Sequence, residues 1–353
     1  MPKFLKKLDN HADYKSYVGN KASFPFVAHC LDYNDVHYVS EEESKEILQS
    51  KYLTFEALES GTFKFSGATS ANTLQYSLDD GQTWTTLAHN TNTPTIATGS
   101  NILWKGSGLT IDTNSGIGKY ISTGTFNVKG NIMSLHFGDN FSGQTSLSGK
   151  DNAYKRLFNG CTNIISAENL SLPSTTLSSN CYRYLFNGCS GLTTAPTTLP
   201  ATALTDYCYS YMFGGCTSLT TAPSLPATAL ASWCYYSMFR GCTSLTTAPE
   251  LPATTLAGDC YAAMFLGCSG LTAAPELPAT TLANSCYSSM FQGCANLNYI
   301  KAMFTTTPGS NYTNNWVYYV KSTGTFVKNS AAQWDVRGVD GIPDGWTVET
   351  ASS

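Results

Sequence analysis

The sequence CYYSMFRGCTSLTTAPELPATTLAGD, residues 234–259, decides the fold, because the chain repeats it with small changes from about 152 to 304. The first cysteine recurs at intervals of 27 and then 26 residues, at Cys181, Cys208, Cys234, Cys260 and Cys286. A second cysteine follows each of them eight residues later, and an incomplete opening copy has Ala153 and Cys161 in the two positions. A fixed period of this length predicts a solenoid of six coils, in which each repeat buries its apolar face against its neighbours.

Each repeat divides into three predicted elements. Cys208, Met212 and Cys216 follow one another at the spacing of a helix face, and Gly215 suits the left-handed residue that ends a short helix or a single turn. The next segment, 219–222, is rich in β-branched residues and predicts a short strand, which a proline ends. Residues 225–230 then return the chain in an extended conformation. Stacked coils of this kind place equivalent residues about 4.8 Å apart.

These motifs resemble a known family. The G-C-x-x-L step, preceded by M-F or L-F, resembles the BspA-like leucine-rich repeats of gut and oral Bacteroidetes. The longer LTTAPxLPATTL phrase looks like repeats in surface and phage proteins of gut Bacteroides, including fibre proteins of crAss-like phages. The tail GTFVKNSAAQWDVRGVDGIPDGWTV is similar to the ending that often follows such repeats. The resemblance implies a leucine-rich-repeat-like solenoid, a scaffold used for adhesion, display and virion structure alike.

The composition disfavours several classes of protein. Charged residues make up 12% of the chain and the formal net charge is −4, whereas nucleic-acid binding needs a basic face. No apolar run approaches the roughly 18 residues of a membrane span, so we expect no membrane insertion. The start of the chain, MPKFLKKLDNHADYKSYVG, lacks the apolar core of a secretory signal. This favours assembly in a host cytoplasm, as in a virion, over export to a bacterial cell surface.

Residues 1–51 are predicted to form an anchoring arm with too few apolar residues for its own core. Residues 24–27 and 36–39 suggest short extended pieces, and the capping-box spacing at Ser40 predicts a short helix to about Ser50. We expect the arm to dock on other virion proteins or on a second copy in a homo-oligomer. Packing against the next domain is the alternative.

Residues 52–149 alternate between apolar and polar side chains, which predicts a small β-sandwich. The alternating segments are 53–55, 61–65, 74–76, 102–104, 124–128 and 133–137. Residues 150–304 hold the repeats, and 305–353 are expected to form a C-terminal β cap. In the cap, 316–320 and 324–327 resemble strands, while Trp334, Ile342 and Trp346 supply bulk to cover the last coil. The predicted fold class is therefore mainly β.

One string resembles part of an enzyme. Residues 77–84 fit the Asp-box of sialidase propellers, S-x-D-x-G-x-T-W. We interpret it as a tight hairpin in which Asp79 bonds backbone amides, Gly81 takes a positive φ and Trp84 packs on the sheet. The box occurs once and no arginine cluster accompanies it. We therefore predict no catalytic residues, no cofactor and no enzymatic activity.

Histidine and cysteine suggest no metal site. His29, Cys30 and His37 lie close in sequence, but their spacing fits no standard zinc site. Ten of the twelve cysteines form the repeat pairs, and stacking would bring equivalent ones within disulfide range. A crowded apolar interior and a reducing cytoplasm instead favour buried free thiols.

Recognition is predicted on the outer positions of the early repeats. The interior positions barely vary between repeats, whereas the outer ones collect aromatic and arginine side chains, as a glycan or protein contact patch would. Drift at unconstrained positions is an equal alternative. The candidate binding residues are Arg183, Tyr184, Tyr207, Tyr211, Trp233, Tyr236 and Arg240.

Together these features predict a non-enzymatic structural or display protein of a phage virion, a head or tail fibre. It would present the solenoid for attachment to host or gut glycans or proteins. The alternative is a bacterial cell-surface adhesin or glycan-binding protein.

Overall fold

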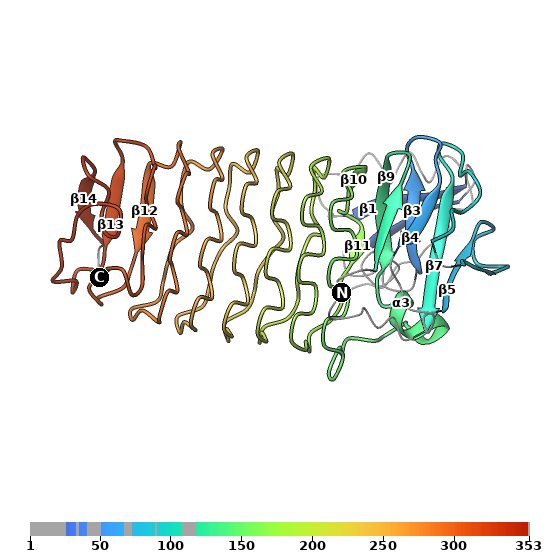
Figure 1. Ribbon diagram of the computed structural model, residues 1–353, viewed down its shortest axis with the longest axis horizontal. Coiled ribbons are helices and arrows are strands. Elements are labelled where there is room, and N and C mark those ends of the chain that lie inside the picture. Colours follow the sequence, from blue (N-terminus) through green and yellow to red (C-terminus); the bar gives the residue numbers. More distant parts are fainter. Residues whose placement is uncertain are drawn as a thin grey trace.

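The computed structural model describes residues 26–32, 35–40, 51–66, 73–88, 90–107 and 118–351. The protein is mainly β (Figure 1): a sheet region is followed by a row of regularly spaced repeats and then by a three-stranded sheet. In the predicted arm, β1 (Phe26–Asp32) and β2 (Asp35–Ser40) pair as an antiparallel hairpin. The helix predicted as far as Ser50 falls on residues 41–50, outside the described residues.

Two sheets form the N-terminal region. The larger one runs in the order β9-β3-β7-β5-β6, and a two-stranded sheet pairs β4 with β8. The strands are β3 (Leu53–Ala57), β4 (Phe63–Ser66), β5 (Thr73–Ser77), β6 (Thr85–Thr86), β7 (Asn101–Ser107), β8 (Lys119–Ser122) and β9 (Phe126–Asn131).

An aromatic core joins the two sheets. The ring of Phe55 in β3 lies 5.2 Å from Phe63 of β4, 5.5 Å from Trp104 of β7 and 4.8 Å from Tyr120 of β8, between ring centroids. All four side chains are buried. In β7 buried residues alternate with partly exposed ones, as expected for a strand that faces a core on one side.

The strand predicted over 133–137 is wrong. Ser134–Phe137 form the short helix α3, and Gly138–Asn140 follow as the 3-10 turn η2. Ser134, Leu135 and His136 are all buried, so this segment has no polar face of the kind that the alternating pattern suggested. Ser134 Oγ holds the turn in place, because it accepts a hydrogen bond from Leu53 N (3.0 Å) and donates one to Trp104 O (2.9 Å).

The helix predicted in each repeat is also wrong, because the cysteine-containing segments are runs of tight turns. Their backbone N–H groups alternate between two kinds of acceptor. Met212 N donates to Tyr209 O within its own repeat (3.1 Å), whereas Tyr211 N donates to Tyr236 O in the next repeat (2.9 Å). Phe213 N likewise reaches forward, to Met238 O (2.9 Å). Half of the amides are thus used to join neighbouring repeats, which an α-helix could not allow.

The remainder of each repeat runs beside its neighbours through scattered parallel bridges. Thr194 pairs with Thr221 in the predicted strand segment, and Ala203 pairs with Ala229 in the extended return. Gly215 has the predicted positive φ, +74°. Its counterparts in five other repeats have φ between +72° and +76°: Gly160, Gly188, Gly241, Gly267 and Gly293.

The row of repeats is continuous with the sheets at both of its ends. At the N-terminal end β10 (Ile164–Ser166) and β11 (Leu170–Ser171) from the first repeat pair in parallel with β9. At the other end β12 (Tyr299–Ala302), β13 (Thr325–Lys328) and β14 (Thr347–Thr350) form a parallel sheet. The predicted strand at 324–327 is therefore confirmed as β13.

The segment 316–320, predicted as a strand, instead continues the turns of the repeats. Phe291 N donates to Trp316 O (2.8 Å) and Gly293 N donates to Tyr318 O (2.8 Å), the bonds that one repeat makes to the next. Asn315 has a φ of +54°, close to that of Ser289, which lies 26 residues earlier. The chain therefore adds a further repeat after 304 in which other residues replace the cysteines.

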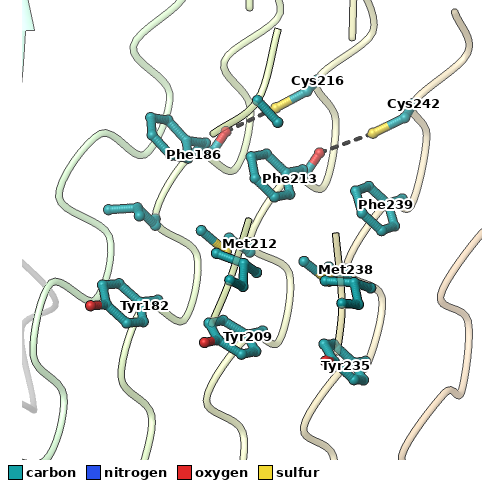
Figure 2. Close-up of a cluster of buried hydrophobic side chains, with 14 of the residues drawn as sticks. Tyr182, Phe186, Tyr209, Met212, Phe213, Cys216, Tyr235, Met238, Phe239 and Cys242 are labelled. Carbon is teal, nitrogen blue, oxygen red and sulfur yellow. Dashed lines mark hydrogen bonds between the residues drawn. The ribbon is translucent and has the colours of Figure 1, made fainter. Parts of the chain in front are cut away.

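Aromatic side chains form two columns through the interior of the repeats (Figure 2). Six tyrosines stack with centroids 5.5–6.0 Å apart, from Tyr154 to Tyr287, and six phenylalanines stack 5.3–5.9 Å apart, from Phe158 to Phe291. The ring of Tyr120 stacks on Phe158 at 5.7 Å, so the N-terminal sheets cover the first repeat.

The eleven cysteines from Cys161 to Cys294 are all free and buried. In the five complete repeats the second thiol donates a hydrogen bond to a phenylalanine carbonyl of the preceding repeat; for Cys216 and Phe186 the distance is 3.1 Å (Figure 2). Burial raises the pKa of Cys161 and Cys181 to about 11 and that of Cys208, Cys268 and Cys286 to about 12. These thiols are therefore protonated at neutral pH and unreactive as nucleophiles.

Candidate functional site

The seven predicted binding residues come together on one outer surface. They belong to three successive repeats, and the backbone joins these repeats directly: Tyr184 N donates to Ser210 O (3.0 Å) and Tyr211 N to Tyr236 O. Arg240 is exposed and the other six are partly exposed. Tyr184, Tyr207, Tyr211 and Trp233 all have φ values between +56° and +61°. These outer side chains thus stand on left-handed backbone, a conformation that the buried Tyr182 shares.

The aromatic rings of this surface stack from repeat to repeat. Tyr184 and Tyr211 lie 4.8 Å apart with an interplanar angle of 16°, and Tyr207 and Trp233 lie 5.7 Å apart at 11°. Tyr236 joins the two stacks, because its ring meets Tyr211 at 5.3 Å and Trp233 at 4.8 Å, edge to face in both cases. Each contact of this kind stabilises the pair by about 1 kcal/mol beyond its buried area.

Arginines cover the ring faces at the N-terminal end of the stacks. The guanidinium of Arg183 lies 5.1 Å from the ring centre of Tyr184 and 4.7 Å from that of Tyr207, and Arg156 lies 5.1 Å from Tyr184. Arg183 Nη1 donates a hydrogen bond to Asn180 Oδ1 (2.9 Å), while its Nε is buried without a hydrogen-bond partner. We call Arg156 and the seven predicted residues the arginine–aromatic row.

Positive charge extends over the row. Burial, Arg183 and Arg156 together lower the pKa of Lys155. At the other end, burial favours the neutral form of Tyr211, but the polar groups of Ser237, Tyr236 and Arg240 beside its hydroxyl and the charge of Arg240 outweigh it and lower the Tyr211 pKa. Among the described residues, no carboxylate lies within ion-pair distance of Lys155, Arg156, Arg183 or Arg240.

Lys155 and Arg156 were not among the predicted binding residues. They belong to the incomplete first copy, where Ala153 replaces the cysteine that marks the repeat. The signal that could have found them is the period, because Arg156 lies 28 residues before Tyr184 and Cys161 lies 28 before Cys189. Its φ of +63° matches that of Tyr184 and confirms that the two positions are equivalent.

The later repeats keep the backbone and lose the row. At the position of Trp233, just before the first cysteine, the next two repeats have Asp259 and Ser285. At the position of Tyr211, the following repeats have Ser237, then Ala263 and Ser289. Their φ values remain between +51° and +54°. The row is thus a local feature on a uniform scaffold.

The Asp-box forms the predicted turn. Asp79 Oδ1 accepts hydrogen bonds from Thr83 N (2.8 Å) and Ser77 Oγ (2.7 Å), and Oδ2 accepts one from Thr83 Oγ1 (2.6 Å). These bonds, led by that of the Thr83 hydroxyl, lower the pKa of Asp79 to about 2. Gly81 has a φ of +89°, as predicted, and Trp84 packs against Tyr52 with ring centroids 4.8 Å apart. Both carboxylate oxygens of Asp79 are therefore used in hydrogen bonds that stabilise the turn.

Other candidate sites are less developed. The β1–β2 hairpin pairs His29 with His37. Within the part of the chain that the structure describes, no three His, Cys, Asp or Glu side chains are placed to hold a metal ion. No helix of that same part is long and apolar enough to cross a membrane.

In comparisons with known proteins, no protein-family model, no curated protein and no solved structure matched the chain.

Proposed function

We propose that this chain is a non-enzymatic display protein of a phage virion, a head or tail fibre. Its repeats would form a leucine-rich-repeat-like solenoid that presents the arginine–aromatic row to a glycan or protein on the host surface. The observation that carries the attachment role is the row itself: eight side chains from four successive repeats that contact one another on one outer surface. The virion assignment is supported by the resemblance of the LTTAPxLPATTL repeats to those of phage fibre proteins.

The scaffold is suited to display. Interior columns of stacked rings and thiol–carbonyl bonds recur from repeat to repeat, so the outer positions can change without disturbing the core. Binding surfaces on rigid repeats lose little entropy when a partner docks. Residues 1–51 would join the chain to other virion proteins and to further copies of itself.

The test separates anchoring from display. A chain that lacks residues 1–51 and a chain that lacks residues 150–304 are expressed during infection, and purified virions are probed for each with an antibody. We expect the first deletion to abolish incorporation and the second to leave it intact. Incorporation of the chain without residues 1–51 at the normal level would refute this division, and immunogold labelling of bacterial envelopes instead of virions would support a surface adhesin.

A further inference from the structure

We infer that the arginine–aromatic row binds an anionic polysaccharide, one that carries sulfate or carboxylate groups along its length. This inference rests on the proposed display function and names the chemical class of the ligand. It follows from three features of the row: its cations lack ionic partners, its ring faces are occupied, and it crosses the repeats as a line.

The first feature is the unpaired positive charge. Arg156, Arg183 and Arg240 contribute three positive charges in a chain whose formal net charge is −4, and Lys155 lies beside Arg156 in the sequence. The ion pairs of the described residues involve other side chains. For Arg183, the structure gives one hydrogen bond to a side chain, at Nη1, and a buried Nε without a partner. Guanidinium groups without a carboxylate partner match the paired oxygens of sulfate and carboxylate groups.

Two of the carboxylates that border the row accept hydrogen bonds from backbone amides of the next repeat. Asp151 Oδ1 accepts a hydrogen bond from Ser179 N (3.2 Å), and Asp206 Oδ1 accepts one from Ser232 N (3.1 Å). Each therefore links its own repeat to the next one. Asp259 comes only after the last ring of the row, 26 residues beyond Trp233.

The second feature is the orientation of the rings. A neutral sugar usually binds by stacking on a free aromatic face. Here the faces of Tyr184 and Tyr207 are occupied by guanidinium groups and by the next ring, with interplanar angles of 16° and 11° to Tyr211 and Trp233. The rings therefore hold the arginines in place, and the arginines provide the recognition. A cation that is stacked on a ring loses less side-chain entropy when it binds an anion.

The third feature is the shape of the charged surface. The cations occur in three of the four repeats: Arg156 in the first, Arg183 in the second and Arg240 in the fourth. The rings of the third repeat lie between them, 4.8 Å and 5.7 Å from rings of its two neighbours. A chain of regularly repeated anionic units laid along the repeats would meet one cation after another. Several weak contacts on one ligand add up through effective concentration, so a polymer binds far more tightly than its monomer.

Binding to immobilised dextran sulfate tests the inference, with polygalacturonate as the carboxylate polymer and neutral dextran as the uncharged one. We expect binding to at least one anionic polymer, none to dextran, and weakening as salt is raised. In the double variant Arg183→Gln/Arg240→Gln, affinity should fall by about tenfold or more, as expected for the loss of two charge-assisted contacts. The matched control Lys64→Gln/Lys321→Gln removes the same charge outside the row and should bind as the original protein does.

Each other outcome overturns the inference. Equal losses in the two double variants would show that net charge alone drives binding. Equal binding to dextran would indicate a neutral glycan, and binding to polyglutamate but to neither anionic polysaccharide would indicate an acidic protein. Arg240→Gln alone changes an exposed side chain, so a folded form of this variant without any loss of affinity would also count against the row. If the protein binds host cells through the row but no anionic polymer, the ligand class is wrong and the display function stands; if it binds neither, both fail.

Discussion

Repeats 180–242 and repeats 259–294 share an interior and differ in what they expose. In both regions the tyrosine and phenylalanine columns are fully buried and nearly parallel: Phe213 stacks on Phe239 at 2° and Phe265 on Phe291 at 4°. The outer positions hold Tyr211 and Trp233 in the first region, and Ala263 and Ser285 in the second. Stability and surface chemistry therefore depend on separate positions of one repeat.

A rise in pH should disrupt both regions together, and this is the largest effect we expect. The pKa of Cys208 and of Cys268, one in each region, is raised from 9.0 to about 12 by burial. In the unfolded chain these thiols lose their protons first, so stability is complete below about pH 9 and falls as the pH rises toward the folded values. Above about pH 9 each buried thiol lowers the free energy of unfolding by about 1.4 kcal/mol per pH unit, and eleven buried thiols contribute.

We therefore expect cooperative unfolding between about pH 9 and about pH 11, which circular dichroism would detect. As a control, a thiol reagent should react slowly with the native protein at pH 8 and with all twelve cysteines in denaturant without reductant. An unchanged spectrum at pH 11, or fewer reactive thiols in denaturant, would contradict the picture of buried free cysteines.

Truncation of one interior ring should cost the same in either region. Phe213→Ala and Phe265→Ala each remove a fully buried ring that is stacked on both sides, with centroid distances of 5.6 Å for Phe213 and 5.7–5.9 Å for Phe265. We expect each to lower the free energy of unfolding by about 3–5 kcal/mol.

Guanidinium denaturation measures both variants, and the two losses should agree within about 2 kcal/mol, the scatter between similar core sites. Tyr211→Ala is the matched control on the outer row, since the equivalent later residue is already Ala263. If Phe265→Ala proved nearly neutral, the later repeats would not share the cooperative core of the earlier ones.

The interior was predictable from the sequence, but the backbone that supports it was not. Cys208, Met212 and Cys216 are fully buried on one side, as their four-residue spacing indicated. That spacing does not distinguish a helix from a run of turns closed by bonds such as Met212 N to Tyr209 O, because both return the chain to the same side after three or four residues. Long-range hydrogen bonds decide between the two, because alternate amides must donate to carbonyls of the next repeat.

The row was predictable as a set because residues at one position of adjacent repeats must be neighbours once the repeats stack. What the period could not give was the contact between positions, such as Arg183 between Tyr184 and Tyr207. That contact depends on the left-handed conformation of Tyr184 and Tyr207. Glycine favours this conformation, whereas a tyrosine in the sequence does not predict it.

Outer residues with a left-handed backbone should lower the free energy of unfolding in both regions. The later region, repeats 259–294, allows the cleaner test. Ser289 has a φ of +54° and a small side chain, whereas its neighbour Ser288 has no such conformation. Ser289→Gly should raise the free energy of unfolding by about 0.5–1 kcal/mol, because glycine adopts this conformation without strain. Ser288→Gly should lower it by a similar amount through the added entropy of the unfolded chain. Thermal denaturation compares the two, and equal losses in both would show that the position is not strained.

The smallest effect we expect is also the one that most directly links the two regions. Leu266 occupies the position of Arg240 one repeat later, and the two are adjacent, since Gly241 N donates to Leu266 O (2.7 Å). Leu266→Arg would extend the line of cations into the later region without touching the interior columns. Affinity for dextran sulfate should then rise by about two- to fivefold, the range that one exposed charge contact provides. Stability should change by less than about 0.5 kcal/mol, because the side chain is only partly buried. Leu266→Gln is the matched control, with similar length and no charge, and it should leave the affinity unchanged. An equal gain in both variants would point to the loss of the leucine as the cause, and no gain in either would place the end of the binding surface at Arg240.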